Sequence, residues 1–284
     1  MCVNLKGQKM EQPKISEERL AVMAKIKEYE SLGGDNYFND VENDPPPKVL
    51  MPEDVDYLKK KLSSKFRYNS TKRIIKKMLK DYAVEHKIEI NGIENLAKVP
   101  GGAVITTNHF HPFDASSLIY AFKISKDKHK YHIVIREGNY QIPGLFGFIL
   151  RNFCTFPLSS NVKTTMNLNK AIDTVLNKGH YLVVYPEQSM WWNYKKPRKY
   201  RIGAFRWASR NNVPVIPCFT TLSDLDGYED DGLRKQKLTY HIGEPIYPDP
   251  NKTPKENAEI MLEKNREFTI GVYEKVYGVK YEIN

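Results

Sequence analysis

The sequence has few cysteines and no long uncharged hydrophobic run. Its 284 residues include three cysteines, Cys2, Cys154 and Cys218, which share no motif spacing. A sparse and odd count argues against a disulfide framework and is typical of a reducing cytoplasm. No window approaches the roughly 18 apolar residues that a transmembrane helix requires. The N-terminal stretch also lacks the apolar core and cleavage site of a secretory signal. We therefore expect a cytoplasmic chain without a transmembrane helix.

Acidic residues are missing from two long stretches. The chain carries 44 basic and 34 acidic residues, a net charge of +10, but ten Lys or Arg and no acid lie between Tyr57 and Lys80. Seven more basic residues, again without an acid, lie between Gln188 and Ser223. Such clusters indicate anionic partners: phospholipid head groups, nucleic acid, a coenzyme phosphate or an acidic carrier protein. No recognisable nucleic-acid-binding module is present, so we expect no nucleic-acid partner.

The order of predicted elements changes near residue 88. Residues 1–87 predict an N-terminal arm and basic amphipathic helices, suited to docking on a membrane or a partner. One helix begins after Ser16, an acidic and proline-rich arm follows, and residues 54–84 predict two helical pieces that break at Asn69-Ser70. Residues 88–284 alternate strands with helices. They predict an α/β domain with a mainly parallel or mixed sheet flanked by helices, and with the N-terminal helices as an appendage.

The basic segment at 54–84 has two interpretations. Leu58, Leu62 and Phe66 recur at helical spacing, so one side is apolar and the other strongly basic. This pattern is typical of a helix on a membrane surface, but also of a helix packed on a core with a solvated face. The absence of acids favours an anionic surface. We predict that it is contacted by Lys72, Arg73, Lys76 and Lys77.

The stretch "TTNHFHPFD" at 106–114 raises the question of chemistry. His109 and His111 could begin a zinc site, because alternate residues of an extended segment point the same way. Zinc requires three or four ligands, however, and no other histidine or cysteine of the chain repeats a ligand spacing. We expect no metal. A metal-dependent hydrolase that uses His109, His111 and Asp114 remains an alternative.

His109 and Asp114 can instead form a pair. A strand should end before His109, and a helix should begin near Asp114, so the turn between them can bring the carboxylate onto the imidazole. Asp114 would then fix the tautomer while His109 removes a proton from a hydroxyl. Asp114 could equally be a simple helix cap, with His109 an ordinary loop residue.

Several ordered blocks resemble the glycerolipid acyltransferase family, whose members are similar to 1-acylglycerol-3-phosphate acyltransferase. "NHFHPFD" resembles the family's N-H-x4-D block, and "YLVVYPEQS" stands where the family has Phe-Pro-Glu-Gly-Thr-Arg. Further blocks between residues 88 and 247 keep the family's order. The resemblance implies an α/β acyltransferase with His109 as base and Asp114 as its partner. It also implies acyl-CoA or acyl-carrier protein as donor and a glycerolipid hydroxyl at the membrane as acceptor, with no further cofactor.

Two expected arginines of the family are missing. Ser160 stands at the first position, and Gln188-Ser189-Met190 replaces the Gly-Thr-Arg that carries the second. In the family both arginines are associated with the acceptor's phosphate, for which a guanidinium is a natural clamp. Lysophosphatidate-like acceptors therefore compete with a non-phosphate acceptor such as a glycolipid. We predict that the substrate contacts Asn108, Glu187, Lys195, Lys196 and Arg198.

The segment "MWWNYKK" at 190–196 combines aromatic and basic residues. Trp191 and Trp192 could dock at a membrane interface, or they could pack into the rim of the fold. Together these features predict a peripheral acyltransferase of phospholipid biosynthesis on the inner face of an anionic membrane. Acyl-carrier protein is a further candidate partner, and a non-catalytic lipid-binding protein of the same fold is a further alternative.

Overall fold

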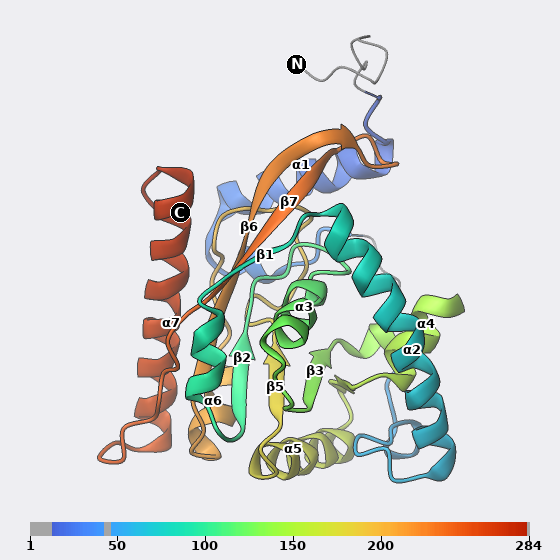
Figure 1. The fold of residues 1–284 in the computed structure, drawn as a ribbon, viewed down its shortest axis with the longest axis vertical. Helices are drawn as coiled ribbons and strands as arrows, with labels where there is room; N and C mark the ends of the chain where they lie inside the picture. Colours follow the sequence, from blue (N-terminus) through green and yellow to red (C-terminus); the bar gives the residue numbers. More distant parts are fainter. Residues whose placement is uncertain (1–12, 43–46, 283–284) are drawn as a thin grey trace.

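The computed structural model describes residues 13–42 and 47–282, which build a mixed sheet with helices on both faces (Figure 1). The sheet has seven strands in the order β1-β7-β6-β2-β5-β3-β4. The run from β6 to β4 is parallel, whereas β7 is antiparallel to β6 and parallel to β1. The predicted fold class is confirmed. The strands are β1 Glu89–Asn91, β2 Ala103–Thr106, β3 Tyr131–Ile135, β4 Thr155–Pro157, β5 Tyr181–Val184, β6 Val215–Tyr228 and β7 Arg234–Ile242.

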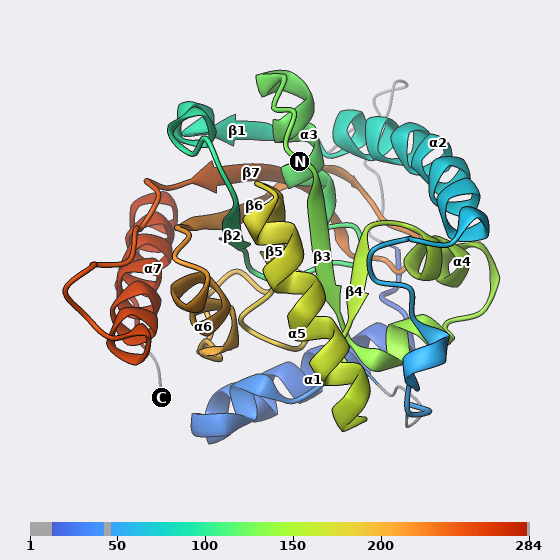
Figure 2. The same cartoon turned by 90° about the horizontal axis from the view of Figure 1, so that it is seen from below.

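The helices divide between the two faces of the sheet (Figure 2). One core cluster joins α5, α6 and α7 to the sheet, and a second joins α3 and the 3-10 helix at Ile93–Lys98 to the opposite face. Each cluster takes alternate side chains of the same strands, because successive residues of a strand point to opposite faces. The α-helices are α1 Glu17–Leu32, α2 Leu62–Glu85, α3 Ala115–Ser125, α4 Gly144–Asn152, α5 Val162–Asn177, α6 Gly203–Arg210 and α7 Pro254–Tyr277.

The central strands β2 and β5 position the two loops that follow them. Both are fully buried and apolar or β-branched throughout, as strands covered on both faces must be. They pair in parallel from Ala103 opposite Tyr181 to Thr106 opposite Val184. Since their carboxyl ends lie side by side, the loop after β2 and the loop after β5 emerge at the same edge of the sheet, where ligands of α/β folds bind.

Helix α2 is continuous, so the predicted break at Asn69-Ser70 is wrong. Ser70 and Thr71 do not cap a new helix, because their hydroxyls donate to carbonyl oxygens of the preceding turn, at Phe66 for Ser70 and at Arg67 and Tyr68 for Thr71. The large apolar side chains of α2 divide between solvent and the body of the protein. Leu62 is 83% exposed and Phe66 74% exposed, whereas Ile75 packs on the last residues of α4.

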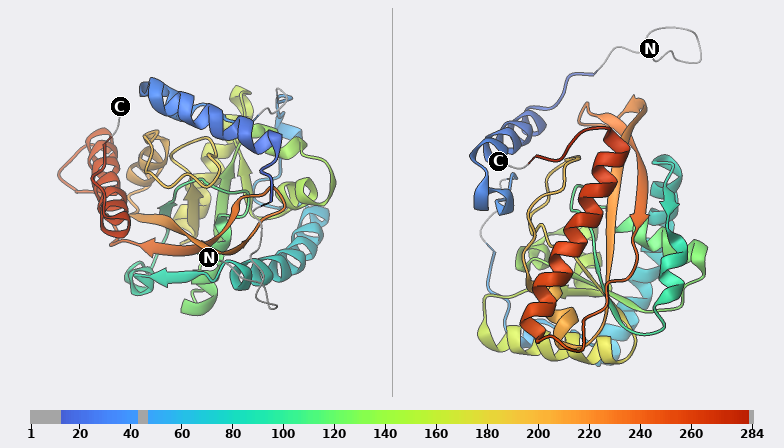
Figure 3. Two further views of the ribbon diagram at one scale, coloured as in Figure 1. Left: turned by 90° about the horizontal axis from the view of Figure 1, so that it is seen from above. Right: turned by 90° about the vertical axis from the view of Figure 1, so that its left-hand side faces the viewer.

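The N-terminal arm wraps the body on the side opposite α2 (Figure 3). Ser16 caps α1 as predicted, since its hydroxyl accepts from the N–H of Arg19. Tyr37 and Val41, which follow α1, are buried against Trp191. The predicted division at residues 87 and 88 remains a prediction, although both the arm and α2 pack on the α/β body. Within the described residues, no helix is both long and apolar enough to span a bilayer.

Candidate active site

The loop after β2 is anchored by Asn108. Its side-chain amide donates to the carbonyl of Thr220 at 3.0 Å, and its amide oxygen accepts from the N–H of the same residue at 2.8 Å. Asn108 is 3% exposed. The prediction that it contacts substrate is therefore wrong for this structure, because both ends of the amide are already bonded to β6. Its role is to fix the start of the histidine loop against the neighbouring strand.

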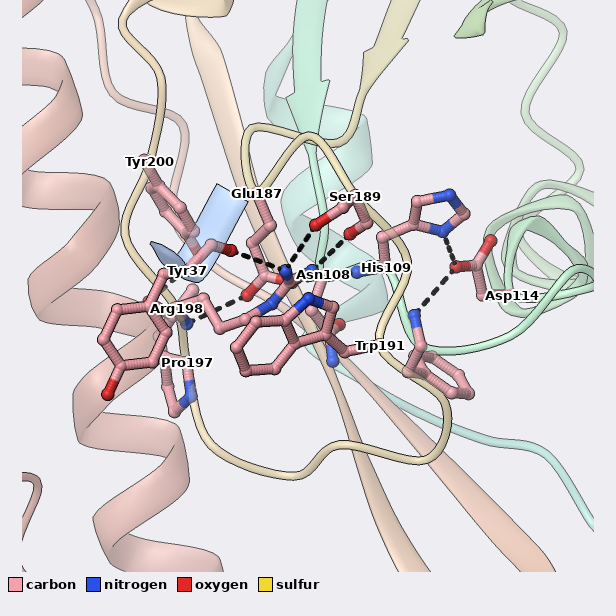
Figure 4. Close-up of polar contacts among 12 residues, drawn as sticks. Tyr37, Asn108, His109, Asp114, Glu187, Ser189, Trp191, Pro197, Arg198 and Tyr200 are labelled. Atoms are coloured by element: carbon pink, nitrogen blue, oxygen red, sulfur yellow. Dashed lines mark hydrogen bonds and ion pairs between the residues drawn. The ribbon is translucent and has the colours of Figure 1, made fainter. Parts of the chain in front are cut away.

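His109 and Asp114 form the predicted pair (Figure 4). Nδ1 of His109 lies 2.6 Å from Oδ2 of Asp114, which also accepts from the N–H of Phe110 at 3.2 Å. The carboxylate makes no side-chain cap to α3, so the simple helix-cap interpretation does not hold. Because a carboxylate only accepts, Nδ1 carries the proton and Nε2 is the ring nitrogen without one. The imidazole is 24% exposed and the carboxylate 3% exposed, so the ring reaches the surface while its partner is buried.

Tyr185 completes this pair and was not predicted. It follows β5 directly, and its hydroxyl donates to Oδ1 of Asp114 at 2.7 Å. Its ring stacks on the imidazole of His109, with centroids 4.2 Å apart and planes 26° from parallel. Burial raises the pKa of Tyr185 well above its usual value, and the Asp114 carboxylate adds to the shift, so the phenol stays protonated. The position at the carboxyl end of β5 was the available sign of a site residue.

His111 is turned away from the pair. Its Nδ1 lies 3.1 Å from the hydroxyl of Tyr82 and accepts from the N–H of Phe113 at 3.1 Å. Burial lowers the pKa of His111 to about 4, which keeps the ring neutral near pH 7. Among the described residues, no group of three or more His, Cys, Asp or Glu side chains is arranged to hold a metal ion. This geometry gives no support to the hydrolase alternative.

Glu187 and Arg198 form a second, buried pair behind the histidine loop (Figure 4). Glu187 accepts from the N–H of His109 at 3.1 Å, from the N–H of Arg198 at 3.0 Å and from the guanidinium of Arg198 at 3.1 Å. Arg198 also donates to the carbonyl of Tyr37 and to the hydroxyl of Ser189, each at 2.9 Å, and to the Ser189 carbonyl. The pair thus ties the "PEQS" loop, the histidine loop and the N-terminal arm together.

The burial of this pair corrects two predictions. Arg198 is 1% exposed and Glu187 2% exposed, so neither reaches a substrate from this position. Burial lowers the pKa of Arg198, an effect that the Glu187 carboxylate opposes. Arg198 therefore does not replace a missing phosphate clamp. Glu187 instead orders the loops through its bonds to the N–H groups of His109 and Arg198.

The tryptophans of "MWW" are packed into the fold. Trp191 is 0% exposed, stacks on Tyr37 and donates its indole N–H to the carbonyl of Asn39 at 2.9 Å. The prediction that Trp191 docks on a membrane is wrong, because no part of its ring reaches the surface. Trp192 is half-buried, and the guanidinium of Arg19 lies 3.5 Å from its ring centroid. A membrane contact by Trp192 remains a prediction.

The remaining predicted residues lie apart from the pair. Lys196 is half-buried and lies 3.4 Å from the carboxylate of Glu30, whereas Lys195 is exposed. Ser160, at the position of the first missing arginine, donates to the carboxylate of Glu137 at 3.1 Å. The side chains predicted to contact a membrane from α2, Lys72, Arg73, Lys76 and Lys77, are all exposed. Their contact with an anionic surface remains a prediction.

Comparison with known proteins identifies the region that contains the pair. The acyltransferase family model matches residues 87–221. These residues form an acyltransferase domain. The resemblance to acyltransferases drawn from the motifs is thereby confirmed for this region. The region contains His109, Asp114, Tyr185, Glu187 and Arg198, whereas α1, α2 and α7 lie outside the matched residues.

Similarity to other known proteins is weak. The chain is similar to the crystal structure of the 1-acyl-sn-glycerophosphate (LPA) acyltransferase PlsC from Thermotoga maritima. That match has a TM-score of 0.42 and 18% sequence identity, and it covers 67% of this chain and 79% of that chain. No curated protein matches the sequence.

Proposed function

We propose that this acyltransferase moves an acyl group from the thioester of acyl-CoA or acyl-carrier protein to a hydroxyl of a lysophospholipid at a membrane surface. One observation carries the proposal. Nδ1 of His109 lies 2.6 Å from the buried carboxylate of Asp114, while the imidazole itself is partly exposed. An imidazole whose tautomer is fixed by a carboxylate, and whose other nitrogen faces outward, is suited to act as a general base.

The proposed reaction follows from this tautomer. Nε2 of His109 takes the proton from the acceptor hydroxyl as the oxygen attacks the thioester carbonyl carbon. The tetrahedral intermediate then collapses, the carbon–sulfur bond breaks, and the leaving thiolate takes the proton back from the imidazolium. Asp114 stays ionised and stabilises the imidazolium through Nδ1. The products are an ester and a free thiol, and the base returns to its starting state.

The acceptor has two candidates. The family resemblance supports a lysophosphatidate-like acceptor with a phosphate next to its hydroxyl. The buried position of Arg198 favours a second candidate, a lipid without a phosphomonoester such as a glycolipid, because this guanidinium already bonds Glu187, Ser189 and Tyr37. Lys195 and Arg201, two other basic residues of the same segment, are exposed.

Helix α2 supports action at an anionic membrane. Its outward side carries the basic residues of the acid-free stretch, and Leu62 and Phe66, one turn apart, are 83% and 74% exposed. Exposed large apolar side chains flanked by lysines are suited to the head-group region of a bilayer, where the apolar groups enter and the cations meet phosphate. At the other end of α2, Tyr82 contacts His111 of the histidine loop. The helix therefore connects the proposed membrane contact to the site.

A donor and acceptor screen tests the proposal. Radiolabelled acyl-CoA and acyl-carrier protein are offered separately with lysophosphatidate, other lysophospholipids and glycolipids in vesicles. Transfer to a lipid hydroxyl supports the proposal, and the preferred lipid decides between the two acceptors. Free fatty acid as the sole product, abolished by a chelator, would support the metal-dependent hydrolase instead. Binding of lipid without any transfer would support the non-catalytic alternative.

A further inference from the structure

The pair of His109 and Asp114 has a third member, Tyr185, whose hydroxyl donates to Asp114. The block at 185–189 reads Tyr-Pro-Glu-Gln-Ser, where the resembling family has phenylalanine at the first position. The block as the resemblance gives it therefore lacks the hydroxyl that Tyr185 carries. It lies 2.7 Å from Oδ1 of Asp114, on the oxygen that His109 does not use. Asp114 then receives the Tyr185 hydroxyl on one oxygen, and the His109 imidazole and the Phe110 N–H on the other.

We infer that Tyr185 is a positioning residue that holds the Asp114 carboxylate and the His109 imidazole in the orientation of the general base. The inference rests on the proposed function, since it assigns a role toward the base named there. Two separate contacts carry it. The hydroxyl fixes the plane of the carboxylate, so that Oδ2 points at Nδ1, and the ring lies 4.2 Å from the imidazole and restricts its rotation. A misplacement of reacting groups by about 1 Å costs on the order of 100-fold in rate.

The hydroxyl should also alter the proton affinity of the base. A hydrogen bond to a carboxylate spreads its negative charge, and Asp114 then stabilises the imidazolium less. The other ionisable groups around the loop are Glu187, which accepts from the N–H of His109 and pairs with Arg198, and on the α2 side Tyr82 and His111. A change confined to the Tyr185 hydroxyl leaves all of these in place.

Tyr185→Phe provides the test, because it keeps the stacked ring and removes one hydroxyl. We expect the acidic limb of the kcat/KM profile to move to higher pH by about 0.5 to 1 unit, since the undiluted charge of Asp114 stabilises the protonated imidazole. At the plateau we expect kcat to fall roughly 3- to 10-fold with KM unchanged. Tyr185→Leu, which also removes the stacking ring, should lower kcat further.

Tyr181→Phe is the matched control. Tyr181 lies on β5 too, is buried, and its hydroxyl lies 3.4 Å from the Asp127 carboxylate, at the opposite end of the strand. It should leave the profile unchanged. A Tyr185→Phe profile that superimposes on the wild type, in a protein that unfolds at the same temperature, would overturn the inference. So would an equal shift in Tyr181→Phe.

A second readout separates this inference from the proposed function. Nitrogen-15 NMR of labelled imidazole follows the His109 titration and tautomer without any turnover, with the resonance assigned by its loss in His109→Ala. A raised titration midpoint in Tyr185→Phe supports the inference even if His109→Ala retains transfer, which would contradict the general-base role. An unchanged midpoint together with loss of transfer in His109→Ala would leave the base assignment standing and reject the role of Tyr185.

Discussion

The two charged pairs of the site use similar contacts for different purposes. His109 and Asp114 meet at 2.6 Å with side chains 24% and 3% exposed, and Arg198 and Glu187 meet at 3.1 Å with side chains 0% and 3% exposed. The imidazole is partly open to solvent, whereas the guanidinium is occupied by Glu187, Ser189 and the Tyr37 carbonyl. The difference teaches that the exposure and remaining bonding capacity of a pair, more than its residue types, separate a pair suited to catalysis from a structural one.

The largest expected effect tests the catalytic pair. His109→Ala should lower the rate of acyl transfer by roughly 10²- to 10⁴-fold, because it removes the group that accepts the proton of the acceptor hydroxyl. The fold should be retained, since the imidazole is partly exposed. Transfer from a radiolabelled thioester at saturating acceptor, together with circular dichroism of the purified variant, measures both.

His111→Gln is the control for this substitution. Its ring makes structural contacts to Tyr82 and the N–H of Phe113, so we expect transfer to remain within about tenfold of the wild type. Equal and nearly complete losses in the two histidine variants would contradict the comparison. That outcome would favour a site in which both histidines act together, as in the metal-dependent alternative.

Loss of the buried pair of Arg198 and Glu187 should lower the free energy of unfolding. Arg198→Met leaves the buried carboxylate of Glu187 without its cation, and breaking a buried ion pair costs about 3–5 kcal/mol. Urea denaturation at constant pH gives the change in the free energy of unfolding. The exposed pair of Arg210 and Asp173, with side chains 47% and 41% exposed, provides a matched variant. Arg210→Met should cost less than about 1 kcal/mol.

The double variant Glu187→Gln with Arg198→Met refines this prediction. It leaves no unpaired charge in the interior, so much of the lost stability should return. If Arg198→Met were no more destabilising than Arg210→Met, the buried pair would not hold the loops together. If it instead raised KM for the acceptor and left stability unchanged, Arg198 would bind substrate, as the sequence had predicted.

The contact between His109 and Asp114 could be predicted because it is local in sequence. Four residues lie between His109 and Asp114, a strand precedes them, and a helix follows. The turn between two such elements fixes the distance between the side chains. The fold class could be predicted for a similar reason, since alternating strands and helices allow few arrangements. The short strand β4 could not, because its three residues, Thr155–Pro157, carry no periodic pattern.

The second pair depends on contacts that are distant in sequence. Arg198 is buried because Tyr37, 161 positions away, offers its carbonyl and Trp191 covers the guanidinium. From the sequence, a basic residue in a basic segment is expected to be exposed. Arg198 is buried because the N-terminal arm lies over the loop that carries it. Tyr185 was missed for a related reason. Its hydroxyl meets Asp114 through the register of β2 and β5, which a single sequence does not reveal.

Helix α2 offers solvent-facing cations that the buried pair lacks. Replacing Lys72, Arg73, Lys76 and Lys77 with glutamine should weaken binding to anionic vesicles by roughly 1,000-fold, given about 1 kcal/mol per basic residue near such a surface. Sedimentation with vesicles rich in phosphatidylserine or phosphatidylglycerol measures the binding. The wild-type affinity should also fall as salt is raised.

Four exposed lysines at the far end of α3 provide the matched set. They are Lys123, Lys126, Lys128 and Lys130. Glutamine at these positions makes the same change in net charge on a different surface, and it should weaken binding much less. Equal losses for the two sets would mean that net charge, and not α2, attracts the membrane. Loss of binding in Leu62→Ser with Phe66→Ser would further support insertion of the α2 side chains.

The smallest expected effect is the contribution of His111 to the pH dependence of the free energy of unfolding. Burial lowers the pKa of His111 from 6.5 to about 4, so the folded protein binds fewer protons than the unfolded chain between these values. The stability that neutral His111 contributes is complete above pH 6.5 and is lost as the pH falls toward 4. Between pH 7 and pH 5.5 the loss should be about 1 kcal/mol. Urea denaturation of the wild type and of His111→Gln measures it, because the variant should lose this part of the pH dependence while other groups titrate equally in both. If the free energy of unfolding of His111→Gln depended on pH as steeply as that of the wild type, His111 would not be held neutral. The contrast between an accessible His109 and a buried, structural His111 would then be contradicted.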